Sequence, residues 1–370
     1  MKTMGFCMQP LDVLFFRDGR PFTGSERSVS GLPLPQTFAG AIRTALLRAA
    51  GCDFGRLKQE LERGKSFDQA VQAACTQEHH WIGQLAVRGP WLARRNNATD
   101  NLEVLVPVPA NLHQEKYKHT GPLRRLTPLP REQLPGWNPP QDQQDLRPLW
   151  LKHLSSTEPA AGYLTPQGLA RFLGDESVLS EDLVAADELF GLDYRTGIGI
   201  APDRLVAEES QIFGRGFLAL EKDVYLYAEI EMPSDAPDGL FDQVKTLTLG
   251  GEARHVTLKR LPSPFTWPNK SPNAKQKPLI LLATPCPFEA GWKPRILDGQ
   301  LVAAAVPGSL AFSGWDLARG GPKPTRFAVP AGSVYFLKSL PNNWQPGLAE
   351  SDEDRRQGWG YCLTGVWTDE

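Results

Sequence analysis

Two stretches near the amino terminus decide the fold and the function expected for this chain. They are Asp12-Val-Leu-Phe-Phe-Arg-Asp-Gly-Arg-Pro-Phe22 and Gly31-Leu-Pro-Leu-Pro-Gln-Thr-Phe-Ala-Gly-Ala-Ile-Arg-Thr-Ala-Leu-Leu47. The first predicts an apolar strand over residues 11–16 that runs into a turn carrying Arg17 and Arg20. The second predicts a helix entered through prolines, which are tolerated in a first helical turn. A strand, an arginine-rich turn and a helix N-terminus together suit the binding of an anion.

The predicted helix carries Gly40 and, about one turn later, Arg43. Its apolar residues recur at helical spacing, and Gly51 is a suitable end. A glycine in mid-helix costs about 1 kcal/mol relative to alanine. A close approach by another backbone or by a ligand would offset that cost, and Arg43 favours an anionic ligand. A packed helix whose arginine only covers its surface is the alternative.

Composition limits the class of protein. At 370 residues the chain is long enough for two or three domains and a sizeable core. No apolar run approaches the roughly 20 residues that span a bilayer, and the start of the chain lacks the features of a signal peptide. The five cysteines are scattered and form no C-x-x-C pair, which argues against a zinc site and a disulfide framework. We therefore expect a protein of the reducing cytoplasm, without a membrane partner.

Charge is segregated along the chain although the formal net charge is only −2. Residues 88–131 are mainly basic, and residues 254–277 contain basic residues and no acid. Acidic residues gather in 175–188, 229–242 and 350–354. Separated faces of this kind can hold a polyanion on one side and a protein on another.

The pattern of elements predicts an α+β protein with long ordered loops, which the 33 prolines and 34 glycines favour. Residues 224–232 form the clearest alternating strand, and the proline-rich residues 232–239 that follow predict a domain boundary. We expect an N-terminal domain over 1–235, with an insertion at about 111–166 and a hairpin at about 194–213, and a C-terminal domain over 236–370. Further strands are expected at 246–249, 256–258, 279–283, 301–306, 334–337 and 361–367. Short helices that alternate with paired strands, twice, suggest two βαββαβ units.

Several arginine- and glycine-containing segments could contact RNA. The turn with Arg17 and Arg20 could bind phosphate or a base edge, or its arginines could pair with Asp12 or Asp18 in an ordinary surface turn. A hairpin around Arg195 could lie along an RNA strand, or be a plain β-hairpin. Glycines at 250 and 251 would let the backbone approach phosphates. The candidate RNA-binding residues are Arg17, Arg20, Gly40, Arg43, Arg195, Gly197, Gly250, Gly251, Arg254, Arg319, Lys323 and Arg326.

Enzyme motifs are missing from the sequence. The six histidines form no H-E-x-x-H, H-x-H or Cys/His ligand set. There is no G-x-S-x-G elbow and no G-x-x-x-x-G-K-[ST] loop. We therefore predict no catalytic residues, no metal, no cofactor and no small-molecule substrate.

Taken together, these residues resemble the RAMP superfamily of CRISPR proteins, and within it the third-subunit family of type III-B (Cmr) effector complexes. The resemblance implies two ferredoxin-like (RRM-like) domains and no catalytic activity. It also implies that the protein holds the repeat-derived 5′ handle of the guide RNA (crRNA) and contacts the large polymerase-like subunit and a RAMP backbone subunit. The segments of this sequence that carry the resemblance are Pro10-Leu-Asp-Val-Leu-Phe-Phe-Arg-Asp-Gly-Arg-Pro-Phe22, Pro33-Leu-Pro-Gln-Thr-Phe-Ala-Gly-Ala-Ile-Arg43, Tyr194-Arg-Thr-Gly-Ile198, Leu249-Gly-Gly-Glu-Ala-Arg254 and Val329-Pro-Ala-Gly-Ser-Val-Tyr335.

Three other readings stay open on the sequence alone. The chain could be a metal-independent RAMP endoribonuclease that processes the guide precursor, which needs a general acid or base near the scissile phosphate. It could be the equivalent capping subunit of another type III complex. It could also be a scaffold whose acidic and tryptophan-rich segments bind proteins and whose arginines are structural.

Overall fold

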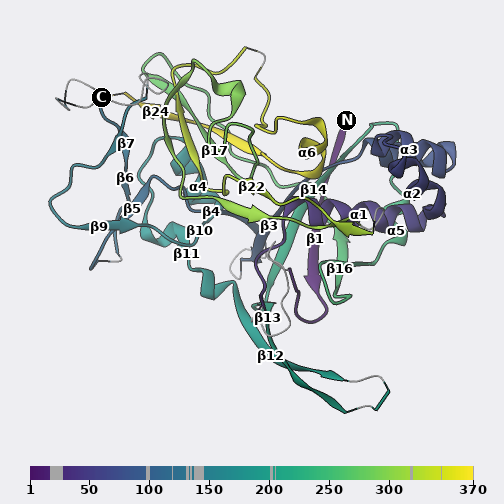
Figure 1. Ribbon diagram of the computed structural model, residues 1–370. Helices are drawn as coiled ribbons and strands as arrows, with labels where there is room; N and C mark the ends of the chain where they lie inside the picture. Colours follow the sequence, from purple (N-terminus) through teal and green to yellow (C-terminus); the bar gives the residue numbers. More distant parts are fainter. Residues whose placement is uncertain are drawn as a thin grey trace. The chain divides into compact units, whose positions relative to one another are not determined.

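The structure is a computed structural model that describes residues 1–16, 28–96, 101–118, 120–130, 133, 136, 146–200, 203–204, 206–316, 320–342 and 344–369. The chain forms two compact units, each assembled from separate segments (Figure 1). The first unit comprises residues 1–90, 189–264 and 311–326, and the second comprises residues 91–188, 265–310 and 327–370. The predicted boundary near residue 236 therefore falls inside the first unit.

The first unit is built on an antiparallel sheet around β1 (Lys2–Pro10). On one side β1 pairs with β14 (Val224–Met232), and on the other with β16 (His255–Arg260), which in turn pairs with β15 (Thr246–Thr248). The pairing of β1 with β16 explains why the chain stays in this unit beyond residue 236. The prediction of a strand over residues 11–16 is wrong, because β1 ends at Pro10. Within residues 11–16, the structure has one isolated β-bridge, between Leu14 and Leu218.

Helix α1 (Pro35–Ala49) confirms the helix predicted from the second decisive stretch, with Pro35 in its first turn. Phe38, Ile42 and Leu46 are almost fully buried, which follows from their spacing of three to four residues. The other helices of the unit are α2 (Phe54–Glu62), α3 (Phe67–Ala74), the 3₁₀ helix η1 (Gln77–Gln84) and the short α5 (Leu240–Gln243). Strand β3 (Ala86–Arg95) begins in this unit and passes into the second.

One disulfide bond departs from the sequence expectation. Cys52 and Cys75 are bonded, with Cα atoms 4.5 Å apart. The backbone N–H of Asp53 donates to Ala74 at 2.9 Å, so the start of α2 lies against the end of α3. The inference of a reducing compartment assumed unpaired cysteines and loses that support. No helix in the described part of the chain has both the length and the apolar character needed to cross a membrane.

Strand β14 confirms the predicted alternation, but both of its faces are covered. Its even-numbered residues are buried as expected, and Tyr227 and Glu229 on the other face are also buried. The Tyr227 hydroxyl donates to Glu229 at 2.9 Å, and Arg88 makes an ion pair with the same carboxylate at 3.5 Å. These partners make burial of the carboxylate tolerable.

A long hairpin extends away from the sheet of the first unit (Figure 1). It consists of β12 (Phe190–Ile200) and β13 (Ala207–Leu220), which pair in antiparallel register from Phe190 and Leu220 outward. The short β2 (Ser28–Val29) adds to β13 in parallel. Two further ladders lie late in the chain, β19 (Leu310–Phe312) with β22 (Arg326–Ala328), and β20 (Trp315–Asp316) with β21 (Gly321–Pro322).

The second unit contains a four-stranded antiparallel sheet in the order β18-β23-β17-β24. In chain order its elements are β17 (Gln276–Leu282), η6 (Arg295–Leu297), β18 (Leu301–Ala305), β23 (Val334–Leu337), α6 (Asp352–Gln357) and β24 (Cys362–Thr368). The strands confirm those predicted from the apolar runs in this half of the chain. Gly365 of β24 lies against α4, since a Cβ there would approach the Cα of Leu173 to 2.9 Å.

The remaining elements of the second unit come from residues 91–188. Residues Leu92–Arg95 of β3 pair with β4, which pairs with β10, which pairs with β11. These strands and their neighbours are β4 (Leu102–Pro107), β5 (Leu112–Glu115), β6 (Arg124–Arg125), β7 (Thr127–Pro128), β8 (Leu149–Trp150), β9 (Thr157–Pro159), β10 (Tyr163–Leu164), α4 (Pro166–Leu173), η4 (Ser180–Asp182), β11 (Leu183–Val184) and η5 (Ala186–Glu188).

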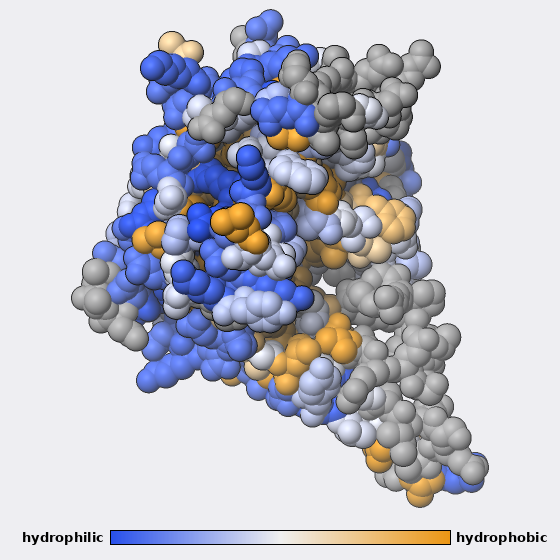
Figure 2. Space-filling model, turned by 90° about the vertical axis from the view of Figure 1, so that its left-hand side faces the viewer, coloured by the Kyte–Doolittle hydropathy of each residue, from blue (hydrophilic) through white to orange (hydrophobic). Residues whose placement is uncertain are grey.

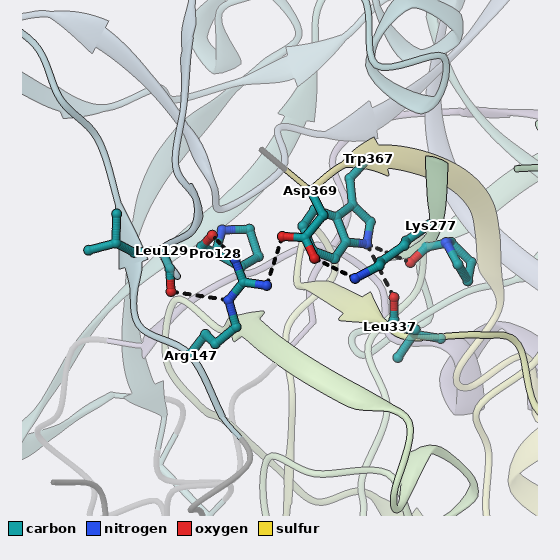
Figure 3. Close-up of polar contacts among 8 residues, drawn as sticks. Pro128, Leu129, Arg147, Lys277, Leu337, Trp367 and Asp369 are labelled. Atoms are coloured by element: carbon teal, nitrogen blue, oxygen red, sulfur yellow. Dashed lines mark hydrogen bonds and ion pairs between the residues drawn. The ribbon is translucent and has the colours of Figure 1, made fainter. Parts of the chain in front are cut away.

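An ion-pair network fixes the expected insertion within the second unit (Figure 3). Arg147 donates to the carbonyl oxygens of Pro128 and Leu129 at 2.7 and 3.1 Å, and to Asp369 at 2.7 Å. Asp369 also pairs with Lys277 of β17. Burial raises the pKa of Asp369, but the bonds from Lys277 and Arg147 lower it more, so the net pKa lies below its ordinary value. The network joins the segment before β8 to the end of β24.

Candidate nucleic-acid interface

A small cluster of apolar side chains lies where residues 11–16 meet β13. Leu14 and Leu218 exchange backbone hydrogen bonds of 2.8 Å in both directions. Val13, Phe15 and Phe217 form a buried cluster on the same strand pair, and the rings of Phe15 and Phe217 have centroids 5.3 Å apart. Charged side chains from three separate parts of the first unit lie over this apolar cluster.

Arg195 and Arg254 both lie over the ring of Phe217. The guanidinium carbon is 5.2 Å from the ring centroid for Arg195 and 4.7 Å for Arg254. Both distances fall within the range of a cation–π contact. Arg195 comes from β12 and Arg254 from the turn that precedes β16. The structure thus brings two predicted RNA-binding residues together, and we call Asp12, Arg195, Phe217 and Arg254 the Phe217 cluster.

Asp12 lies between the two arginines. Arg254 donates to its carboxylate at 2.8 Å, and two nitrogens of Arg195 approach it at 3.4 Å. Arg195 also donates to Asp193 at 2.7 Å. The hydrogen bond from Arg195 lowers the pKa of Asp12, and the hydrogen bond that Arg195 donates to Asp193 is the main cause of a raised pKa for Arg195.

A third arginine lies next to the Phe217 cluster. Arg215 of β13 holds its guanidinium 5.7 Å from the centre of the Phe15 ring and makes an ion pair with Glu252. Three arginines and three carboxylates (Asp12, Asp193 and Glu252) therefore lie on this surface. An anion that binds here must compete with carboxylates of the same chain.

Gly250 and Gly251 pack against the chain itself. Gly250 has a φ of +84°, and a Cβ there would come within 2.5 Å of the carbonyl oxygen of Phe15. The N–H of Gly251 donates to the same oxygen at 2.8 Å. Their close approach is to Phe15 and Phe16, so the requirement for glycine has a structural cause. The turn nevertheless fixes the position of Arg254.

Arg17 and Arg20 lie outside the described residues, but the structure shows both ends of their segment. The N–H of Phe16 donates to the Ser30 hydroxyl at 2.8 Å, and the N–H of Gly31 donates to Phe16 at 3.2 Å. Ser30 donates its own N–H to Gly216 of β13 at 2.8 Å. The described residues on either side of the two predicted arginines, Phe16 and Ser30, therefore lie beside Phe15 and β13.

A second group of predicted residues gathers near the start of α1. The side chain of Gln36 donates to the carbonyl oxygen of Ser313 at 2.8 Å, and a Cβ on Gly314 would lie 3.2 Å from Gln36 and 3.7 Å from Lys323. Gly40 follows Gln36 by one helical turn on the same face. It is exposed, and no described atom lies within 4 Å of the position of its missing Cβ.

Arg326 and Arg319 complete the predicted basic loop. Arg326 is exposed and lies 5.7 Å from the centre of the Phe312 ring. Arg319 lies outside the described residues.

Arg43 lies inside the first unit, in contrast to Arg195 and Arg254. Only 9% of its surface is exposed. Its guanidinium donates to the carbonyl oxygen of Leu85 at 3.3 Å and lies 4.6 Å from the centre of the Phe67 ring. This is the packed arrangement that the sequence left open as an alternative.

Strand β12 of the hairpin carries exposed apolar side chains at alternate positions. Leu192, Tyr194, Ile198 and Ile200 of β12 are exposed. A Cβ on Gly216 would lie 3.0 Å from the Tyr194 ring, so this ring lies over a residue without a side chain. Gly197 pairs with Phe213, two residues from Arg195. Figure 2 shows hydrophobic residues in orange near the end of the hairpin.

Sequence reasoning missed Phe217 and Arg215 and gave Asp12 a different partner. Phe217 carried no signal, because a single aromatic residue in a strand is ordinary core composition. Asp12 was considered only as a partner of Arg17 or Arg20, which follow it in sequence. Its actual partners, Arg195 and Arg254, are 183 and 242 residues away. Pairing over such distances depends on sheet topology.

Metal-ligand geometry does not occur in the part of the chain that the structure describes. There, no group of three or more His, Cys, Asp or Glu side chains is arranged to hold a metal ion. His255 follows Arg254 directly, and its ring lies 3.3 Å from the hydroxyl of Thr248.

Comparison with protein families identifies the chain's relatives. The model of a family described as CRISPR-associated protein (Cas_Cmr3) matches residues 6–367. The chain belongs to this family. The match confirms the resemblance inferred from the motifs and extends it over nearly the whole chain. No curated protein matches the chain.

Solved structures match the chain at low sequence identity. One is a chain of the type III-B Cmr-beta complex bound to cognate target RNA and AMPPnP, with 17% identity and a TM-score of 0.50, over 90% of this chain and 86% of that one. A second, of the same complex bound to cognate target RNA, has 16% identity and a TM-score of 0.49 over the same shares. A chain of a type III-A Csm3-Csm4 subcomplex has 11% identity and a TM-score of 0.42, over 99% of this chain and 100% of that one.

Proposed function

We propose that this chain is a non-catalytic RNA-binding subunit of a type III CRISPR effector complex. In that complex it would anchor the 5′ handle of the crRNA and bridge the large polymerase-like subunit to the RAMP backbone subunits, in the cytoplasm. The observation that carries the proposal is the convergence of Arg195 and Arg254 over Phe217. Phe16, the last described residue before Arg17, directly follows Phe15 of the same apolar cluster.

The chemistry of the Phe217 cluster suits single-stranded RNA. A guanidinium held over an aromatic ring is restricted in position, and arginine binds phosphate through two parallel hydrogen bonds. Loops on a sheet scaffold commonly bind RNA with phosphate contacts and with stacking. The handle has a fixed sequence, so it can also be read through base edges, whereas a variable guide must be held through its backbone.

Carboxylates of the chain compete with RNA phosphates for the arginines, and this competition determines the affinity of the site for RNA. Asp12 is 54% exposed and Arg195 is 41% exposed, and exposed ion pairs contribute only about 0–1 kcal/mol. A phosphate can therefore replace Asp12 at a small cost.

The hairpin β12–β13 extends the proposed RNA-binding surface beyond the Phe217 cluster. Tyr194 precedes Arg195 and is 55% exposed, so an aromatic ring for stacking lies on the opposite face of β12 from Arg195. Gly40 and Lys323 form a second contact region on the proposed RNA path, where the missing side chain of Gly40 would allow a backbone to approach.

The proposal also assigns the ferredoxin-like fold to both units. In the second unit, β17, η6, β18, β23, α6 and β24 follow the order β-α-β-β-α-β, and the sheet order β18-β23-β17-β24 is strand 2-3-1-4 of that motif. In the first unit, β1, α1, β3, β14, α5 and β16 give the same motif and the same order, β3-β14-β1-β16. The likeness to a chain of a type III-B complex with target RNA supports this assignment.

One observation favours an endoribonuclease as the second candidate. His255 directly follows Arg254, and histidine is the usual general acid or base in metal-independent cleavage. Incubation of the purified protein with repeat RNA, with and without His255→Ala, distinguishes the two functions. Intact RNA is expected, and cleavage that depends on His255 would replace the binding role with an enzymatic one.

The binding role is tested by the double variant Arg195→Ala/Arg254→Ala. With handle RNA and the full chain, the dissociation constant is expected to rise at least about tenfold. The dependence of log K on log salt should become shallower by about 1.4, since each lost phosphate contact on a single strand removes about 0.7. Arg295→Ala/Arg355→Ala is the control, because both of these arginines also pair with a carboxylate. Equal effects of the two double variants would contradict the proposal.

A further inference from the structure

The second unit has an exposed basic tip where β5 ends and β9 begins. The N–H of Lys118 donates to the carbonyl oxygen of Glu115 at 3.1 Å, so residues 115–118 form a tight turn. The N–H of Lys116 donates to Ser156 at 3.0 Å and joins this turn to the segment that precedes β9. We call residues 115–118 and 152–156 the β5–β9 tip.

Side-chain contacts hold the two halves of the tip together. His153 lies 3.6 Å from the carboxylate of Glu115, which also pairs with Arg124 at 3.3 Å. The His153 ring accepts a hydrogen bond from the N–H of Ser155 at 3.2 Å. Glu115, the acidic residue of the turn, is thus paired with neighbouring side chains. These contacts fix the position of the rest of the turn.

The outer surface of the tip combines positive charge with exposed apolar groups. Lys116, Lys118 and Lys152 are exposed, and none of them makes an ion pair with a described carboxylate. Tyr117 is 88% exposed, with the Lys116 ammonium 5.9 Å from its ring centre. Leu154 is fully exposed. A pocket next to the turn is lined by Glu115 as well as by Lys118, Thr120, Arg124 and Ser180.

We propose that the β5–β9 tip binds single-stranded RNA, with its lysines on phosphates and Tyr117 stacked on a base. Three lysines that pair with no carboxylate among the described residues favour a polyanion. An exposed tyrosine ring offers the flat surface that bases of any sequence stack on. The tip consists of two short loops, whereas a stable protein interface takes about 800 Å² from each partner. This site uses none of the residues of the Phe217 cluster and does not depend on it.

The lysines are tested by measuring binding of a fluorescent single-stranded RNA to the full chain at several salt concentrations. Lys116→Gln/Lys118→Gln/Lys152→Gln is expected to weaken binding at least tenfold and to reduce the slope of log K against log salt by about 2. Lys270→Gln/Lys275→Gln/Lys338→Gln is the control, because it removes the same charge from exposed lysines elsewhere in the second unit. Equal losses from both triple variants would overturn the proposal, since they would show only diffuse attraction.

The stacking contact is tested separately. Tyr117→Ala is expected to weaken binding about tenfold and Tyr117→Phe to bind as wild type, since the ring and not the hydroxyl makes the contact. On an RNA without bases, the wild type and Tyr117→Ala should bind equally. Wild-type RNA binding by Tyr117→Ala would overturn the proposal. The same follows if the tip variants bind RNA normally but fail to join the other subunits, which would make the tip a protein contact.

The two RNA sites are distinguished by combining the variants. If Arg195→Ala/Arg254→Ala abolishes recognition of the handle while the lysine triple still changes the salt slope, both proposals hold. If the arginine pair has no effect and the triple still lowers affinity, the tip alone is the RNA site.

Discussion

Arg254 donates a 2.8 Å hydrogen bond to Asp12, a residue 242 positions earlier in the chain. The bond joins the turn before β16 to the segment that follows β1, and it holds the guanidinium over Phe217. Both residues lie in stretches that the sequence marked as candidate RNA contacts. Their pairing makes Asp12 the residue whose replacement separates an RNA-binding role of the arginines from a structural one.

Asp12→Asn is expected to raise the affinity for handle RNA about twofold to fivefold, since it removes a competing exposed carboxylate worth about 1 kcal/mol or less. If the arginines were only structural, the variant would gain no affinity. Asp298→Asn, which removes the partner of Lys293 in the second unit, is the control. Fluorescence anisotropy with wild-type and variant protein measures the difference.

The same pair has a defined pH dependence. The pKa of Asp12 is lowered in the folded protein by its arginine partners, so the pair stabilises the fold above the unfolded pKa. That stability is lost as the pH falls through the folded pKa, which lies below the ordinary 3.8. Urea unfolding should show a wild-type advantage over Asp12→Asn that is constant from pH 5 to 8 and shrinks toward pH 3. An advantage that changes between pH 6 and 8 would contradict this assignment.

Gly40→Ala is expected to change stability and binding in opposite directions. The methyl group enters open space on α1 and raises helix propensity, so the unfolding free energy should increase by up to about 1 kcal/mol. Binding of RNA or assembly with the other subunits should weaken, because the methyl group blocks a close approach. Thr44→Ala, also on α1, is the control for a gain in helix propensity without added atoms. Thermal unfolding and complex reconstitution test both halves, and unchanged assembly would remove Gly40 from the interface.

Gly250→Ala should destabilise the first unit by about 2 kcal/mol or more, from its left-handed backbone and from the contact with Phe15. Gly291→Ala is a matched control, since Gly291 has a φ of +75° but nothing within 4 Å of its Cβ position. It should show the backbone cost alone, about 1 kcal/mol. Chemical unfolding of both variants gives the difference, and equal losses would mean that the packing on Phe15 is unimportant.

Arg88→Met should lower the unfolding free energy by about 1–3 kcal/mol, because Glu229 is left buried without this charged partner. Arg94→Met is the matched control. Arg94 is exposed to the same degree as Arg88, but its partner Glu103 is 19% exposed against 2% for Glu229. The control should therefore lose less than about 1 kcal/mol.

Local sequence predicted the elements well where a single periodicity governs them. Helix α1 and strand β14 follow directly from the spacing of their apolar residues. The division into units could not be predicted, because strands far apart in sequence complete each sheet. The link between Cys52 and Cys75 was missed for a similar reason, since two intervening helices bring the ends together.

The candidate site was predicted only in part. Arg195 and Arg254 were chosen for their local glycine-rich context, and the structure brings them together. Arg43 was chosen in the same way but is buried against Phe67 and Leu85. A helical arginine can point outward or along a neighbouring helix, and the packing partner decides which. That partner is not visible in a local motif.

The most direct test of the central claim is photo-crosslinking of the assembled complex with 4-thiouridine placed in the 5′ handle of the crRNA. The account predicts crosslinked peptides from residues 12–16, 190–220 and 249–254 of this chain, reduced in Arg195→Ala/Arg254→Ala. Crosslinks that avoid these three segments, with the handle protected by another subunit, would contradict it.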